Sequence, residues 1–204
     1  MISGHMFLWL SWILWIIVTF FMTKSRTRTL LAIWILLTII GSNMFIVVEN
    51  YYISYAYLSM IIGALIMHGK CLRWIYHIFV SLTVMIGYTA ILLWEYTSPI
   101  WMVLPRFVII PSLCCLMILP LVRGIYNQLM TGLLGICSGE LLYSLMLSGY
   151  HLHKPIGDSV FLDHILLIMI SLFVIHIIHQ IRAKLFALSQ TVPPPIKWPD
   201  EKIM

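Results

Sequence analysis

Long apolar stretches follow one another along this chain, each separated from the next by a few polar residues. The hydrocarbon core of a bilayer is about 30 Å thick, so about 20 helical residues are needed to cross it. The stretches are continuously apolar and lack the alternation of a lipid-facing barrel strand. The pattern predicts seven transmembrane helices, at about residues 5–23, 29–48, 52–68, 75–94, 100–122, 125–147 and 160–181.

Basic residues give these spans an orientation. Cytoplasmic loops of membrane proteins carry an excess of Lys and Arg. With the first connection in the cytoplasm, Lys154 is the one basic residue outside, and Arg106 lies within a span. The other ten fall inside: Lys24, Arg26, Arg28, Lys70, Arg73, Arg123, Arg182, Lys184, Lys197 and Lys202. We therefore expect an all-α, polytopic transmembrane helix bundle with its N-terminus outside and its C-terminus cytoplasmic.

Two regions are predicted within the chain. Residues 1–184 form the seven-helix transmembrane domain. Residues 185–204 form a cytoplasmic tail, which holds the run Pro193-Pro194-Pro195 and is expected to be extended without a core of its own.

The composition excludes a soluble globular domain. Of the 204 residues, 62% are hydrophobic and 9% are charged, against about 45–50% and 25% in soluble domains. The four cysteines lack a metal-binding spacing and are expected to act as small apolar residues. The net charge of +5 follows the predicted topology and does not indicate nucleic acid.

Four ionisable residues inside the predicted spans are the candidate polar site. A charged group at mid-bilayer costs at least about 2.5–3.5 kcal/mol, so such groups are functional candidates. They are Arg106, Glu140, Asp163 and His164. Arg106 and Glu140 are predicted at similar depth on neighbouring helices, where an ion pair would stabilise both charges.

The candidate pair has two interpretations. It is either a polar clamp that fixes how the helices pack, or part of an outward-facing cluster with Asp163 and His164 in a small transporter or proton-linked permease. A third hypothesis is a haem-binding electron carrier that uses histidines near the cytoplasmic face, such as His68, His77 and His176.

The predicted sixth helix also carries a packing signal. Thr131, Gly135 and Gly139 recur at four-residue steps, and such small residues let another helix approach closely. The motif leads directly to Glu140, so this helix is expected to be the central, tightly packed element.

Catalytic signatures are lacking. The sequence has neither a zinc-protease HExxH nor a Walker A loop, and the seventh span has no lysine for a retinal Schiff base. These absences argue against an enzyme without deciding the question, and apart from the haem hypothesis we expect no cofactor and no metal site.

Two motifs resemble a known family. The segment FLWLSWILWIIVTFFMTKSRTR (7–28) and the motif GELLY (139–143) are similar to YphA-type membrane proteins of spore-forming Gram-positive bacteria. The resemblance implies an uncharacterised multi-pass protein of the bacterial cell membrane, with Glu140 as a family-like polar position. It implies no activity.

Together these observations predict an integral membrane protein with a structural or interaction role and an internal Arg106–Glu140 clamp. The transporter is the alternative. The lipid bilayer is the expected partner, and a membrane-protein partner or a second copy of the chain stays open.

Overall fold

Seven helices make up most of the described structure, a computed structural model that covers residues 5–48, 51–69, 74–97, 105–150, 152 and 154–191. Within this part, the side chains of residues 106 and 187–191 are not described. The helices are α1 (His5–Phe21), α2 (Arg26–Gly41), α3 (Tyr55–Gly69), α4 (Trp74–Thr97), α5 (Arg106–Leu121), α6 (Ile125–Gly149) and α7 (Ser159–Thr191).

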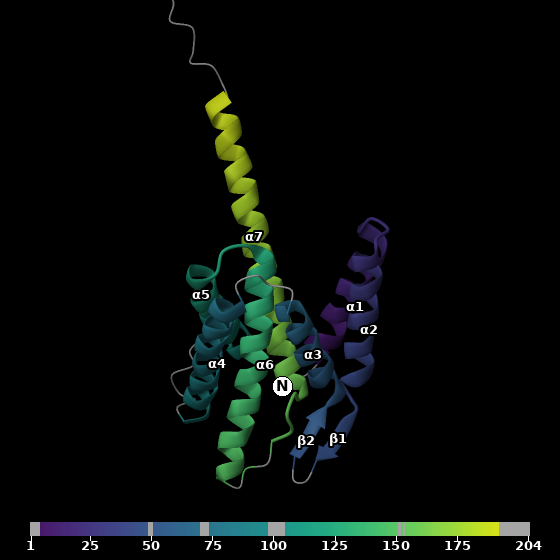
Figure 1. Ribbon diagram of the computed structural model, residues 1–204, viewed down its shortest axis with the longest axis vertical. Helices are drawn as coiled ribbons and strands as arrows, with labels where there is room; N and C mark the ends of the chain where they lie inside the picture. The colour runs from purple at the N-terminus through teal and green to yellow at the C-terminus, as the bar shows by residue number, and fades with distance from the viewer. Residues whose placement is uncertain are drawn as a thin grey trace, which may run out of the picture.

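The helices alternate in direction (Figure 1). The connections 22–25 and 122–124, with Lys24 and Arg123, lie at one end of the bundle, which we call the basic end. The opposite end, which we call the hairpin end, holds a short β-hairpin and the 154–158 segment. This arrangement separates most of the described basic residues from Lys154.

Three of the described helices are long and apolar enough to cross a bilayer: α4, α6 and the part of α7 from Ser159 to Phe186. Shorter apolar helices cover His5–Phe21, Tyr55–Gly69 and Phe107–Leu121. Among the three long helices, α6 has the largest buried share. The structure therefore has α6 at its centre.

The hairpin corrects the all-α expectation. Helix was predicted through 45–48 and 52–54, and this is wrong. Helix α2 ends at Gly41, and β1 (Phe45–Val48) pairs antiparallel with β2 (Tyr51–Ser54). Ile, Val, Phe and Tyr dominate both strands and favour strands as readily as buried helix, so an apolar run alone does not distinguish the two.

The segment after α6 is fixed to this hairpin. The backbone N–H of Ile156 donates to the Tyr52 carbonyl at 2.7 Å, and the N–H of Ser54 donates to the Ile156 carbonyl at 3.0 Å. Gly157 follows with φ +74°, which favours glycine. Asp158 then caps α7, because its carboxylate accepts the Phe161 backbone N–H at 2.9 Å. The chain is thus held in a defined path before α7 begins.

Helix α7 is longer than predicted. It continues to Thr191 and extends well beyond the other helices at the basic end (Figure 1). The expectation of a non-helical tail from residue 185 is wrong for residues 185–191. The reason lies in the sequence. Pro193 is the first proline or glycine after the start of α7, and helical backbone is disfavoured at the residue before a proline. The rest of the predicted tail, 192–204, lies outside the described residues.

Candidate functional site

Glu140 is the most deeply buried carboxyl group in the described structure. It lies on α6 with no exposed surface. One carboxylate oxygen, Oε1, is 3.4 Å from the Lys154 ammonium, and the other, Oε2, accepts a long hydrogen bond of 3.5 Å from the Tyr88 hydroxyl. Because an isolated buried carboxylate is costly, this pairing stabilises the charged form of Glu140.

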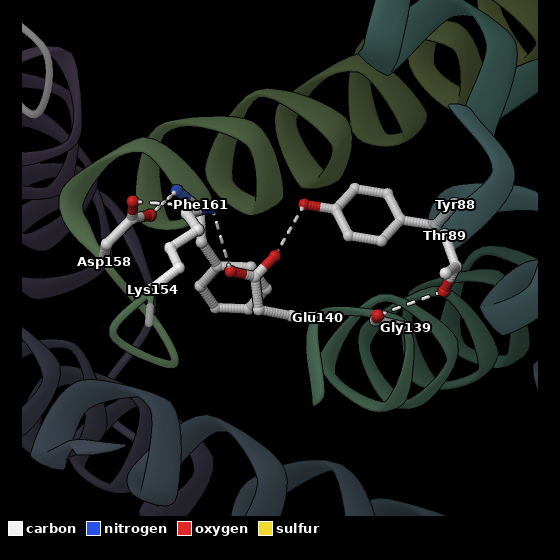
Figure 2. A network of polar contacts seen from close by, with 7 residues as sticks. All are labelled: Tyr88, Thr89, Gly139, Glu140, Lys154, Asp158 and Phe161. Atoms are coloured by element: carbon white, nitrogen blue, oxygen red, sulfur yellow. Dashed lines mark hydrogen bonds and ion pairs between the residues drawn. The ribbon is translucent and has the colours of Figure 1, made fainter. Parts of the chain in front are cut away.

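Lys154 reaches Glu140 from the segment between α6 and α7 (Figure 2). Its ammonium also lies 3.5 Å from Asp158 Oδ2, and 5.2 Å from the centroid of the Tyr143 ring. The Lys154 side chain is 27% exposed, so it is only partly buried. Two carboxylates and an aromatic face therefore share one cation.

The charge state of Lys154 follows from these neighbours. Burial alone would lower the pKa of Lys154, but attraction to Glu140 and Asp158 outweighs it and holds the pKa above its ordinary value. Lys154 is therefore protonated at neutral pH.

A cavity of about 290 Å³ opens beside this pair. Its walls come from α4, α6, the 154–158 segment and the start of α7. Charged or ionisable groups and tyrosines dominate the lining, and the full set is Tyr88, Leu92, Glu95, Tyr96, Glu140, Tyr143, Lys154, Val160, Phe161 and His164. The cavity is large enough for a compact polar ligand and offers it both carboxyl groups and aromatic rings.

The four predicted site residues do not all meet. Glu140 and His164 line the same cavity, and His164 is almost fully buried. Arg106 is the first residue of α5, but its side chain lies outside the described residues. The predicted Arg106–Glu140 pair is therefore still a prediction, whereas the described ion pair of Glu140 is with Lys154.

Asp163 has a different position and contacts the first helix. Its carboxylate accepts the backbone N–H of Phe7 at 2.6 Å. Phe7 is the third residue of α1, where backbone N–H groups have no acceptor within the helix. Asp163 therefore ties α7 to the start of α1, and it is absent from the cavity lining.

The small residues of α6 lie against α4. A Cβ added at Gly135 would be 2.7 Å from Val84 Cβ, and one at Gly139 would be 2.8 Å from a Tyr88 ring carbon. The Thr131 carbonyl accepts a hydrogen bond from Ser81 Oγ at 3.3 Å. This close approach brings Tyr88 within reach of Glu140.

Histidines form a second polar group near the basic end. The rings of His68 on α3 and His77 on α4 have centroids 6.3 Å apart. Within the described part of the chain, no set of three or more His, Cys, Asp or Glu residues is arranged to hold a metal ion.

The family comparison agrees with the membrane character of these helices. The YphA-like integral membrane protein family matches residues 3–193, nearly the whole chain. The chain belongs to the YphA-like family. The resemblance inferred from residues 7–28 and 139–143 is thereby confirmed.

One relative of this family is the "Uncharacterized protein YphA" of Bacillus subtilis (strain 168). It is 28% identical to the chain over 186 residues, which cover 86% of the chain and 90% of the relative. No solved structure matches the chain. YphA-like proteins are thus shown to be integral membrane proteins, and the printed description of this relative assigns no activity.

Sequence reasoning missed Lys154 and Tyr88 as parts of the site. Lys154 did carry a signal, since it is the one basic residue predicted on the outer side. A basic residue on the side where the positive-inside rule predicts few suggests a nearby acidic partner, and here that partner is the buried carboxylate of Glu140. Tyr88 had no such signal within its apolar helix.

Proposed function

We propose that this protein is a small multi-pass permease or solute-binding protein of the bacterial cell membrane. In this proposal the hairpin end faces outward and the basic end faces the cytoplasm. The alternating helix directions support this orientation, because they gather Lys24, Arg123 and the Arg182 end of α7 on one side (Figure 1). All seven helices then belong to the membrane domain.

The observation that carries the functional proposal is the position of Glu140. Its buried carboxylate forms part of the wall of the 290 Å³ cavity and is paired there with an ammonium group. A polar cavity beside a buried charge is what a solute site within a membrane requires, since the solute must exchange water for protein partners.

The cavity favours compact organic cations. Glu95 and Glu140 line it and Asp158 adjoins it, against the single lysine Lys154. The rings of tyrosines such as Tyr143 add faces that attract ammonium groups. Both features would stabilise a positively charged ligand and disfavour an anion.

In this proposal the Lys154 ammonium competes with the cationic solute for the Glu140 carboxylate. This ammonium occupies the position beside Glu140 that a cationic solute would take. A solute that displaces Lys154 would release the 154–158 segment from α6, so binding and movement of this segment would be linked. This linkage gives the site a route between a closed and an open state.

A second candidate is the structural clamp. The Glu140–Lys154 pair and the backbone bonds of Ile156 together fasten the 154–158 segment to α6 and to the hairpin. In that case the pair stabilises the fold and no ligand enters. Arg106 would be a further member of the clamp if it reaches Glu140.

Binding measurements separate the two candidates. Purified protein is titrated with methylammonium, choline and, as the anionic control, acetate. We expect binding of the cations only, weakened about tenfold or more in Glu140→Gln, since a hydrogen bond to a charged group contributes about 1.5–3 kcal/mol. Asp163→Asn is the matched control, because it removes the same charge from a residue absent from the cavity lining. Absence of cation binding by the wild-type protein would refute the permease proposal and leave the clamp.

A further inference from the structure

A second cavity, separate from the Glu140 site, is a groove along α2. It measures about 650 Å³ and runs from Arg28 near the basic end to Gly41, Met44 and Tyr55 near the hairpin. Trp15 and Thr19 of α1 contribute to its walls. The α2 part spans about 20 Å at the helical rise, more than the 15 Å or so of one leaflet of the hydrocarbon core.

The walls of this groove suit a hydrocarbon chain. Apart from Arg28 and two threonines, the lining is apolar or aromatic, and several of its side chains, such as Ile33, Leu37 and Ile40, are half exposed or more. These residues lie in an integral membrane protein, so acyl chains are the surrounding solvent.

Positive charge is concentrated at one end of the groove. The Arg28 guanidinium lies over it from α2 and donates one hydrogen bond, of 3.4 Å, to the Thr19 carbonyl on α1. A guanidinium has five N–H donors. Lys24 lies in the adjoining 22–25 connection. The groove therefore combines an apolar channel with a cationic end, which matches the layout of a phospholipid with an anionic headgroup.

Two polar atoms on the groove walls lack partners among the described residues. They are the indole nitrogen of Trp15 and the hydroxyl of Thr19, both buried. Both atoms are covered by protein and are closed off from the groove, so the case for a ligand rests on the apolar lining and on Arg28.

We propose that the α1–α2 groove is a binding site for an anionic glycerophospholipid. Arg28 holds the phosphate, and an acyl chain lies along α2 towards Met44 and Tyr55. The proposed orientation assigns this lipid to the cytoplasmic leaflet. The site is independent of the Glu140 cavity, so either proposal can fail without the other.

Native mass spectrometry of the full chain tests the proposal. The detergent-solubilised protein is titrated with phosphatidylglycerol and with phosphatidylcholine of the same acyl chains. We expect tighter binding of phosphatidylglycerol, and a loss of about fivefold or more in Arg28→Gln that exceeds the loss for phosphatidylcholine, because the choline cation offsets the charge of its phosphate. The matched control is Arg26→Gln, which removes the same charge from an exposed residue outside the groove lining.

Filling the groove tests the acyl part of the site. Ala32→Phe, with Ala32→Leu as the milder variant, places bulk on the groove wall and is expected to weaken both lipids. Leu30→Phe is its control, because Leu30 is 67% exposed and absent from the lining. Thermal stability of each variant is measured in parallel, so that only folded protein is compared.

Three outcomes would overturn the proposal. Equal loss of phosphatidylglycerol in Arg26→Gln and Arg28→Gln would indicate diffuse attraction to the surface. Unchanged lipid binding in both folded Ala32 variants would show that no chain occupies the groove. A dimer that Ala32→Phe separates, without any change in lipid binding, would assign the groove to a second copy of the protein.

Discussion

Removing the Lys154 ammonium should destabilise the protein much more than removing both members of its pair. In Lys154→Met, the Glu140 carboxylate stays fully buried and loses the partner at 3.4 Å. In the double variant Glu140→Met/Lys154→Met, neither charge is left and the side-chain volumes are nearly kept. Replacement of a whole buried ion pair by apolar residues is often neutral.

The magnitude follows from the burial of the two partners. Breaking a buried pair costs about 3–5 kcal/mol. Because the Lys154 side chain is 27% exposed, the low end applies, about 3 kcal/mol. For a chain of this length that corresponds to a fall in Tm of about 6–12 °C. Glu140→Met should cost less, because Lys154 keeps its contact with Asp158.

Thermal unfolding in detergent can be followed with a thiol-reactive fluorescent dye. The native thiols report on the core, because three of them become reactive only when the bundle opens. These are the buried cysteines Cys114, Cys115 and Cys137. We expect the double variant to lie within about 1 kcal/mol of the wild-type protein, which gives a coupling free energy near 3 kcal/mol.

Additive destabilisation would refute this reasoning. If the double variant loses as much stability as the two single variants together, the ion pair contributes no coupling. Asp158→Asn is a useful control, since asparagine also caps helices and the Glu140–Lys154 contact is retained. This variant should change the free energy of unfolding by less than about 1 kcal/mol.

Three further predictions concern packing, capping and pH. Gly135→Ala should destabilise the protein by about 1–3 kcal/mol in thermal unfolding, because the added Cβ would overlap α4. Gly149→Ala is the control and should be neutral, because nothing lies within 4 Å of its added Cβ. Equal effects of the two variants would contradict the close α4–α6 approach. Asp163→Ala should cost about 1 kcal/mol through the lost cap of α1, and Asp163→Asn should recover most of it; no difference between the two would argue against a capping role. The raised pKa of Lys154 stabilises the fold below its unfolded value of about 10.4, and this contribution is lost as pH rises through the higher folded value. Stability measured from about pH 10 to 12 should therefore fall more steeply in the wild-type protein than in Glu140→Met/Lys154→Met, and parallel curves would refute this assignment.

The order and number of the helices were predictable because each apolar stretch had nearly the length of a span. The hairpin was not, since residues 45–48 are apolar and three of the four, Ile46, Val47 and Val48, are β-branched, which matches either a strand or the end of a buried helix. The charge of Arg182 predicts the end of a membrane span but not the end of the helix, and α7 continues to Thr191 because no glycine or proline precedes Pro193 in this segment.

Glu140 could be singled out from the sequence because a carboxylate inside an apolar stretch is costly. Its described ion-pair partner could not, because Lys154 reaches it through a chain path fixed by the hairpin and by Gly157. That path depends on tertiary hydrogen bonds, which no local pattern encodes. The family membership was predictable from two short motifs, but the family's description names no activity that would have identified the cavity.

The central claim, an outward-facing cavity that prefers cations, is tested most directly by chemical labelling at Val160, which lines the cavity. Val160→Cys, in a protein whose native cysteines are replaced by alanine, is exposed from outside the cell to a cationic and to an anionic methanethiosulfonate. We predict faster reaction with the cationic reagent, and loss of this preference when Glu140→Gln is added. Labelling that occurs only from the cytoplasmic side, or at equal rates for both reagents, would contradict the account.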